Sequence, residues 1–232
     1  QQLHGKNRHF DAALNNMIQG LCMFDKDQRL IVANRRYLDL YGLDGVVPVA
    51  VTSIGRLGAG ASEEILYPEI ARALALRGAE VLLHSTSEVG SPALTPKDIA
   101  KRARAIENLA YVVSANSAGF IDSDLPANST DGMSKIVDFL GEVRAQAGFG
   151  ESSVACAEID LAALRRYRRR PGMGNLLSRQ RLELFAAVYA GQSVYPANTL
   201  LAPDGSLTVP ERSHFLETQR KVIERLAALG LV

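Results

Sequence analysis

The chain has 232 residues, with 26 basic and 25 acidic side chains, 47% hydrophobic residues and 22% charged residues. This length is enough for one or two domains with a sizeable core. A net charge of +1 argues against a dedicated nucleic-acid binder or membrane-surface binder, because both usually depend on a large basic excess.

No stretch reaches the ~18 uninterrupted apolar residues that a membrane span needs, and the first residues lack an apolar signal region. The sequence therefore predicts a cytoplasmic protein. Its two cysteines, Cys22 and Cys156, lie far apart in hydrophobic contexts and form no C-x-x-C pair. We expect both to be buried free thiols, and we expect no metal and no cofactor.

Residues 10–43 predict a helix, a hairpin and a second helix. The hairpin has short apolar strands at residues 21–24 and 30–33 around a polar turn. Asn34 can cap the second helix, which Gly42 ends.

The rest of the chain alternates strands with helices, which is typical of an α/β layered fold. Strands are expected at residues 46–52, 57–61, 79–84 and 111–115, and helices at 69–76 and 96–108. Thr95 caps the second of these helices. Its core-facing side is predicted to consist of Ile99, Ala103 and Ile106.

The last third of the chain predicts a hairpin, a strand and two helices. The hairpin covers residues 134–139 and 142–147, and the strand covers residues 152–159. Asp160 then caps a short helix. A terminal helix at residues 210–229 is expected to turn six apolar residues inward: Phe215, Leu216, Val222, Ile223, Leu226 and Leu229.

Two stretches near the start, Phe10 to Asp25 and Leu30 to Gly42, resemble the opening of a PAS sensor domain of bacterial signalling proteins. A PAS pocket needs further strands to enclose a ligand. We therefore interpret residues 1–43 as a partial PAS-like segment rather than as a working sensor.

Four later blocks, at residues 55–83, 102–119, 132–143 and 157–165, follow one another as in a known family. They resemble the second half of the nitrilase superfamily of carbon-nitrogen hydrolases, over about residues 46–200. The resemblance implies an α/β fold that is half of a four-layer αββα sandwich, preceded by the PAS-like helix-hairpin-helix. We expect residues 46–232 to form this C-terminal half together with a helical tail.

The resemblance also implies a catalytic chemistry, and this sequence departs from the residues that the chemistry needs. The family uses a glutamate base, a lysine and a cysteine nucleophile, which forms a thioester with an amide or nitrile carbon. The cysteine position is Ser62 here. The glutamate and lysine belong to the family's first half, so neither can be assigned to a residue.

A serine hydroxyl is essentially never ionised near pH 7 and needs a positioned base as it attacks. We therefore expect a carbon-nitrogen hydrolase-like protein that is inactive toward its small amide or nitrile ligands, with no action on peptide bonds. The alternative is a non-enzymatic PAS-type sensor or signalling module.

If this site acts, Ser62 attacks and Glu63 or Glu64 is the base. The peptide N–H after Ser62 would then be an oxyanion donor, as is common at strand-to-helix elbows. The alternative is a small residue at an elbow, followed by two acids that suit a helix start.

His84, Ser85 and Asn116 are candidate substrate-pocket residues, because they follow or end buried strands. No G-x-S-x-G elbow supports a hydrolase triad around His84, so a hydrogen-bonded histidine at a strand end is the alternative. Glu107, Asn108 and Asn116 are expected to bond backbone groups around the site.

The arginine-rich block at residues 165–170 is the one concentration of charge. Five arginines and a tyrosine could bind phosphate or RNA, but in a nearly neutral protein a solvated helix face is the alternative that we favour. Half of a sandwich exposes strand edges, so we expect a homo-oligomer. No nucleic-acid or membrane partner is expected.

Overall fold

In the computed structural model, residues 22–24, 30–33, 47–88, 94–119, 132–149, 152–191, 194–196, 199–200, 206–208 and 210–232 are described. Within these ranges, no helix is long and apolar enough to cross a membrane. The described residues fall into two compact units. One contains β3 to α5, and the other contains α6, α7 and most of strands β1 (Cys22–Phe24) and β2 (Leu30–Ala33). These two strands pair as predicted, whereas the helices expected on either side of them lie outside the described residues.

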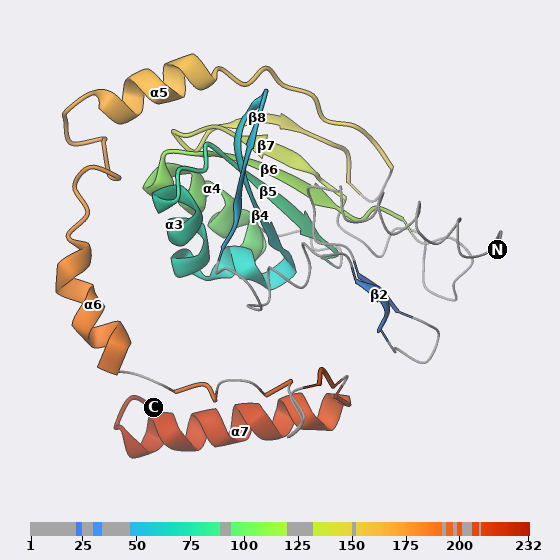
Figure 1. Ribbon diagram of the computed structural model, residues 1–232. Helices are drawn as coiled ribbons and strands as arrows, with labels where there is room; N and C mark the ends of the chain where they lie inside the picture. The colour runs from blue at the N-terminus through green and yellow to red at the C-terminus, as the bar shows by residue number, and fades with distance from the viewer. Residues whose placement is uncertain are drawn as a thin grey trace, which may run out of the picture. The chain divides into compact units, whose positions relative to one another are not determined.

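The first unit is built on a six-stranded sheet in the order β3-β4-β5-β6-β7-β8 (Figure 1). The strands are β3 (Val49–Thr52), β4 (Gly55–Ala61), β5 (Val81–Thr86), β6 (Tyr111–Asn116), β7 (Lys135–Val137) and β8 (Val143–Gln146). The three central strands β4, β5 and β6 are parallel, and the remaining pairs are antiparallel. The predicted α/β alternation and the predicted C-terminal hairpin are therefore confirmed.

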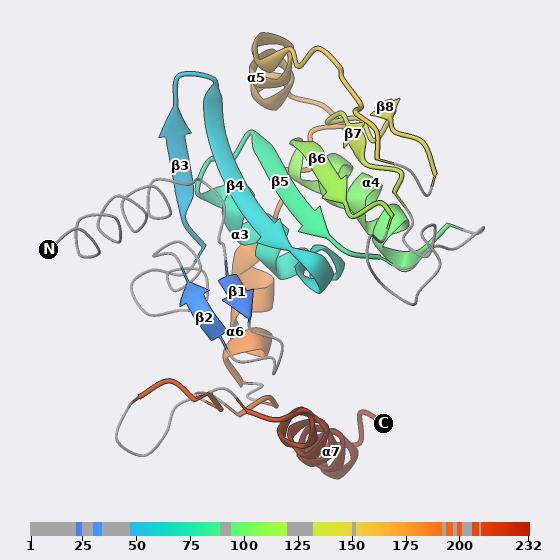
Figure 2. The ribbon, with the colours of Figure 1, turned by 90° about the vertical axis from the view of Figure 1, so that its right-hand side faces the viewer.

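Helices α3 (Pro68–Leu76) and α4 (Pro96–Asn108) pack on one face of this sheet (Figure 2). The core on this face consists of Ala71, Leu74, Ala79, Leu82, Ala105, Ala110, Val112 and Val137. Gly58 of β4 allows the close approach of α3, because a Cβ there would lie 2.8 Å from the Leu74 side chain.

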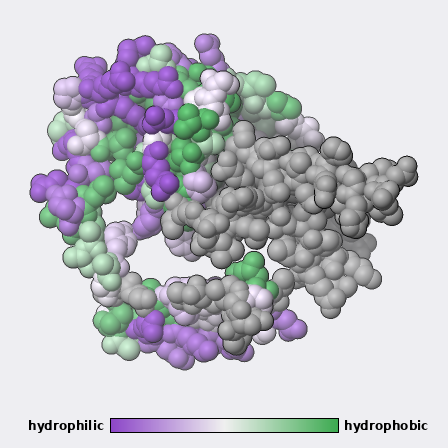
Figure 3. All heavy atoms as spheres, viewed as in Figure 1, coloured by the Kyte–Doolittle hydropathy of each residue, from purple (hydrophilic) through white to green (hydrophobic). Residues whose placement is uncertain are grey.

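Helix α5 (Leu161–Arg169) packs on the opposite face, over a core of Leu57, Val81, Tyr111, Phe139 and Leu164. Asp160 caps the helix, as predicted, by accepting a hydrogen bond from the Ala163 N–H at 2.8 Å. Arg165 donates two hydrogen bonds to Glu80, at 2.6 and 2.9 Å, and Arg168 donates to the Leu109 carbonyl at 2.8 Å. Arg165 and Arg168 of the arginine block therefore hold α5 against the sheet. The surface over α5 is hydrophilic (Figure 3).

The buried side of α4 carries alanines and charged residues in place of the predicted isoleucines, which corrects the predicted core-facing side. Ile99 is 59% exposed and Ile106 is 40% exposed, whereas Asp98, Lys101 and Arg104 are buried. The apolar pattern misleads here because each of these charges has a partner in the fold, and only a partnered charge is tolerated in a protein interior.

Residues 152–159 form no strand, which corrects the predicted strand. The segment joins β8 to α5, and the hydrogen bonds around it go to side chains: the Gly148 N–H bonds Ser153, and the Asp160 N–H bonds Tyr111. Without a neighbouring strand to cover it, Cys156 is an exposed free thiol rather than a buried one.

Helix α6 (Leu182–Gly191) is absent from the sequence-based expectations. Its apolar residues lie all around the helix and give no amphipathic period, so no core-facing side could be recognised. All of its residues are exposed.

Helix α7 (Arg212–Ala228) lies within the predicted range, but its inward side differs from the prediction. The less exposed residues are His214, Thr218, Val222 and Leu226. Four of the six residues expected inside are 45% to 57% exposed: Phe215, Leu216, Ile223 and Leu229. The buried row follows a spacing of four residues, so it is narrower than the apolar face that the sequence predicts.

We predict that Leu164→Ala lowers the free energy of unfolding by about 2–5 kcal/mol, because this fully buried side chain would leave a cavity under α5. Chemical unfolding followed by circular dichroism measures the change. Leu140→Ala is the matched control, since Leu140 is 49% exposed and a change of only about 0.5 kcal/mol is expected. Equal losses in the two variants would contradict the docking of α5 through Leu164.

The Glu80 contact predicts a pH-dependent stability. The hydrogen bonds from Arg165 are the largest cause that holds the pKa of Glu80 below its ordinary value of 4.5. A carboxylate of this kind contributes stability above its unfolded pKa and loses the contribution as the pH falls through its folded pKa. Glu80→Gln should therefore lower the melting temperature at neutral pH, and the gap to the unchanged protein should close below pH 4.5. A gap that is independent of pH in thermal melts would refute this assignment.

Candidate functional site

Ser62 lies at a strand-to-helix elbow. Strand β4 ends at Ala61, and the 3-10 helix η1 (Ser62–Leu66) follows at once. Ser62 is exposed and has a φ of +48°, in the left-handed region that residues other than glycine rarely adopt. Such a conformation costs about 1–3 kcal/mol and persists only where the surrounding structure fixes the backbone.

Neighbouring side chains fix this elbow. Glu64 accepts a hydrogen bond from the Ala61 N–H at 2.7 Å, which braces the end of β4. Arg104 of α4 donates to the carbonyl oxygens of the last two residues of η1, at 2.9 and 2.8 Å. The elbow is therefore held by its own first turn and by the helix behind it.

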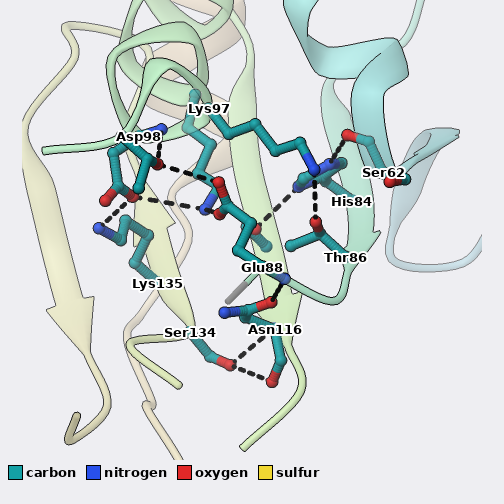
Figure 4. Close-up of polar contacts among 12 residues, drawn as sticks. Ser62, His84, Thr86, Glu88, Lys97, Asp98, Asn116, Ser134 and Lys135 are labelled. Carbon is teal, nitrogen blue, oxygen red and sulfur yellow. Dashed lines mark hydrogen bonds and ion pairs between the residues drawn. The ribbon is translucent and has the colours of Figure 1, made fainter. Parts of the chain in front are cut away.

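His84 of β5 is 3% exposed and joins the elbow to β6 (Figure 4). Its Nε2 lies 2.8 Å from the Ser62 carbonyl oxygen, which can only accept, so Nε2 carries the proton. Its Nδ1 then accepts from the Ser114 hydroxyl at 2.9 Å. The interpretation of His84 as a hydrogen-bonded residue is confirmed, but β5 runs on to Thr86, so His84 lies within the strand rather than at its end. Its place in a substrate pocket stays a prediction.

Four buried charges form a chain beside the elbow (Figure 4). The Lys101 ammonium lies 3.1 Å from Glu88 and 3.4 Å from Asp98, and the Lys135 ammonium lies 2.6 Å from Asp98. Burial would raise the pKa of Asp98, but hydrogen bonds and charge from the two lysines bring it below the ordinary value of 3.8. Two positive and two negative groups balance one another.

Further polar groups come from the ends of neighbouring strands. The Lys97 ammonium lies 3.4 Å from the Thr86 hydroxyl at the end of β5. Thr86 is in register with Asn116 at the end of β6. The carboxyl ends of parallel strands meet at one edge of a sheet, which is where open α/β folds bind their ligands.

Most of the predicted site residues lie at this edge. Those that do are Ser62, Glu63 and Glu64 on the elbow, with His84 and Asn116 on the next two strands. Ser85 does not share their face, because successive side chains of a strand point to opposite sides, and it is exposed on the other side of the sheet.

The residues expected to bond backbone groups divide into two kinds. Asn116 accepts from the Glu88 N–H at 2.8 Å, and Asn108 donates to the Arg104 carbonyl at 2.9 Å, as predicted. Glu107 instead forms an ion pair with Arg104 at 2.8 Å, because the two lie one helical turn apart.

Sequence reasoning missed Lys97 and the four charges of the buried chain. Asp98 and Lys101 are three residues apart on one helix, a spacing that is usual for solvated ion pairs. Their real partners, Glu88 and Lys135, come from distant segments. The sequence therefore indicates that Asp98 and Lys101 lie on the same face of α4, but it does not indicate that this face is buried.

The chemistry available at this edge is polar binding rather than an assembled triad. Among the described residues, no carboxylate or imidazole accepts a hydrogen bond from the Ser62 hydroxyl. In the same part of the chain, no group of three or more His, Cys, Asp or Glu side chains could hold a metal ion.

We predict that His84 stays neutral well below the pH at which an ordinary histidine titrates. Burial is the largest cause that lowers the pKa of His84 below 6.5, and positive charge on Lys101 and Lys97 acts in the same direction. Nitrogen-detected NMR over a pH series should find the Nε2–H tautomer and a midpoint below 6.5. A midpoint at or above that value, or the Nδ1–H tautomer, would contradict the hydrogen bonds assigned to this ring.

Comparison with known proteins finds nitrilase and amidase relatives. The nitrilase and fragile histidine triad fusion protein NitFhit of Caenorhabditis elegans is 32% identical over 140 residues, which are 60% of this chain and 30% of that protein. The deaminated glutathione amidase of Homo sapiens is 33% identical over 118 residues, which are 51% of this chain and 35% of that protein. The matches thus span about a third of the length of these relatives.

Solved structures agree on the fold. The carbon-nitrogen hydrolase from Helicobacter pylori G27 superposes with a TM-score of 0.53 at 22% identity, over 81% of this chain and 76% of that one. The crystal structure of NitFhit from C. elegans gives a TM-score of 0.52 at 27% identity, over 73% of this chain and 38% of that one.

The carbon-nitrogen hydrolase family matches residues 15–169. The match begins inside the segment that we interpreted as PAS-like and runs through its end, so it assigns residues 15–43 to the hydrolase family, and no evidence for a PAS domain accompanies it. The match covers more than half of the 232 residues. The chain belongs to the carbon-nitrogen hydrolase family of the nitrilase superfamily.

Proposed function

We propose that this chain binds small amides or nitriles at the Ser62 elbow without hydrolysing them. The observation that carries the proposal is the left-handed conformation of Ser62, exposed between β4 and η1 and fixed by contacts from β5 and α4. An exposed residue on a strained strand-to-helix turn is the geometry in which hydrolases present a nucleophile.

The residue type at this elbow argues against turnover. In one solved relative, a glutamate-to-glutamine mutant of the amidase from Nesterenkonia sp. AN1, the acetamide moiety of fluoroacetamide is covalently added at the active-site cysteine. Ser62 has a hydroxyl where a thiol would be needed, and a hydroxyl requires a base to remove its proton. Loss of one member of a catalytic set that acts as a unit typically lowers the rate by ~10³- to 10⁶-fold.

The two acids of the elbow are poorly suited to supply that base. Glu64 is already bonded to the Ala61 N–H, and this bond holds its carboxylate against the backbone. Glu63 is exposed, as expected for a solvated acid at a helix start. We therefore propose binding without hydrolysis in preference to a reaction in which Ser62 is the nucleophile and Glu63 or Glu64 is the base.

The competing proposal is a non-enzymatic PAS-type sensor or signalling module. The family match over residues 15–43 favours the hydrolase lineage for that segment. The expected self-association stays a prediction, and the exposed apolar side chains of α6 are consistent with it.

We predict no ammonia release above background from small amides or nitriles, and no acyl adduct on Ser62, because the described part of the chain positions no base at its hydroxyl. An ammonia assay and intact-protein mass spectrometry measure the two. Ser62→Ala is the matched control and should give the same background. An adduct that forms on the unchanged protein and disappears in Ser62→Ala would show that Ser62 is a working nucleophile.

Ser62→Cys tests whether the thiol alone is sufficient. We expect this variant to stay at background with amides, since the described residues place no base at position 62. Measurable hydrolysis by Ser62→Cys would reveal a base that the present account has not identified.

A further inference from the structure

Two arginines meet a buried carboxylate at the amino ends of the central strands. Glu80 directly precedes β5 and is 6% exposed. Arg165 of α5 donates to both of its oxygens, at 2.6 and 2.9 Å, and the backbone N–H of Arg56 on β4 donates to one of them at 3.0 Å. This end of the sheet is opposite to the edge that carries the Ser62 elbow, because β4 begins here and ends at the elbow.

The side chains of Arg56 and Arg168 reach the same place. The Arg56 guanidinium lies over Gly78, where a Cβ would come within 2.7 Å of its Nη1. Arg168 donates through Nη2 to the carbonyl of the next residue, Ala79, at 2.6 Å. Burial is the largest cause that lowers the pKa of Arg168, and the nearby charge of Arg56 acts in the same direction. Two guanidinium groups therefore lie beside consecutive residues of the turn between α3 and β5.

Positive charge exceeds negative charge at this turn. Within the described part of the chain, Glu80 is the one carboxylate that these arginines contact, and it pairs with Arg165. Arg168 is bonded instead to the backbone carbonyls of three residues: Ala79, Asn108 and Leu109. The Arg56 side chain has no hydrogen-bond partner among the described residues. Arg56 and Arg168 therefore carry two positive charges that no carboxylate in contact balances.

Unused hydrogen-bond donors remain on all three arginines. Arg165 and Arg168 each bond through Nε and Nη2, so the Nη1 group of each is left over, together with the whole Arg56 guanidinium. Arg56 and Arg165 are exposed, so a ligand can reach them from solvent. The planar guanidinium fork matches the oxygens of a phosphate or carboxylate group.

The uncompensated charge distinguishes between these anions. A phosphate monoester carries about −1.5 to −2 charges at pH 7 and has three strong acceptor oxygens. It therefore balances most of the excess at this turn, whereas a carboxylate or a phosphodiester balances only about half of it.

We propose that Arg56, Arg165 and Arg168 bind a phosphate monoester at the amino ends of β4 and β5. Arg165 and Arg168 also hold α5 against the sheet, whereas the Arg56 side chain is free to serve the ligand alone. The site is separate from the Ser62 elbow, so its failure would leave the proposed function standing.

The test compares a monoester with a diester, methyl phosphate with dimethyl phosphate, by NMR titration of the full chain at neutral pH. Methyl phosphate should bind about tenfold more tightly, because its second charge adds to the charge-assisted hydrogen bonds. The affinity should fall with added salt, since Arg56 and Arg165 are exposed. Equal binding of the two ligands, or no binding of methyl phosphate, would overturn the proposal without depending on how any variant folds.

Variants then assign the binding to this turn. Arg56→Gln should lower the affinity for methyl phosphate about tenfold at an unchanged melting temperature, because the backbone N–H that Glu80 accepts is kept. Arg56→Lys should retain part of the affinity, since an ammonium supplies the charge without the fork. Arg144→Gln is the matched control, because Arg144 is also exposed but lies on β8 at the far edge of the sheet. An unchanged affinity in Arg56→Gln, or an equal loss in Arg144→Gln, would overturn the assignment.

Two further probes identify the source of the phosphate group. Phosphatidylcholine vesicles that contain phosphatidic acid present the monoester on a lipid, and single-stranded RNA presents phosphodiesters. Binding of methyl phosphate without binding to the vesicles would support a soluble phosphate compound, and vesicle binding that Arg56→Gln abolishes would support a lipid headgroup. A preference for RNA over methyl phosphate that is lost in Arg56→Gln would overturn the monoester site and show a surface for polyanions instead.

Discussion

The pairing of charges on the buried side of α4 is the constraint on which the candidate site depends. Asp98 and Lys101 lie inside the protein only because Glu88, which follows β5, and Lys135 of β7 reach them. Removing one partner of such a pair typically costs about 3–5 kcal/mol, because the other charge stays buried without compensation. The network thereby fixes the start of α4 against the strand ends, and Lys97 is positioned by the same turn of helix.

A second set of contacts fixes the elbow against the same helix. His84 donates to the Ser62 carbonyl, and Arg104 donates to the end of η1. Ser62 can hold its left-handed backbone because these bonds lie on both sides of it. Elbow and ion network are therefore two parts of one rigid edge, and a rigid edge binds a small ligand without a large loss of conformational entropy.

The sequence predicts the order of strands and helices because that order follows from local signals. Pro68 and Gly78 bound one helix, Thr95 begins the next, and continuous apolar runs mark the parallel strands. The predictions that failed concern surfaces. Which side of α4 or α7 is buried, and whether residues 152–159 find a strand partner, depends on contacts between segments that are distant along the chain.

The residues of the candidate site likewise divide into those that local sequence predicts and those that depend on distant contacts. Ser62 and His84 could be proposed from a family resemblance and from a buried strand, whereas the buried ion pairs of Lys101 and Asp98 depend on residues that are distant along the chain. The most direct test of the account is NMR of the labelled chain during titration with acetamide. We predict chemical-shift changes centred on Ser62, His84 and Asn116, with the ligand intact after prolonged incubation. Changes confined to other residues, or conversion of the ligand to acetate and ammonia, would contradict an edge that binds small amides without hydrolysing them.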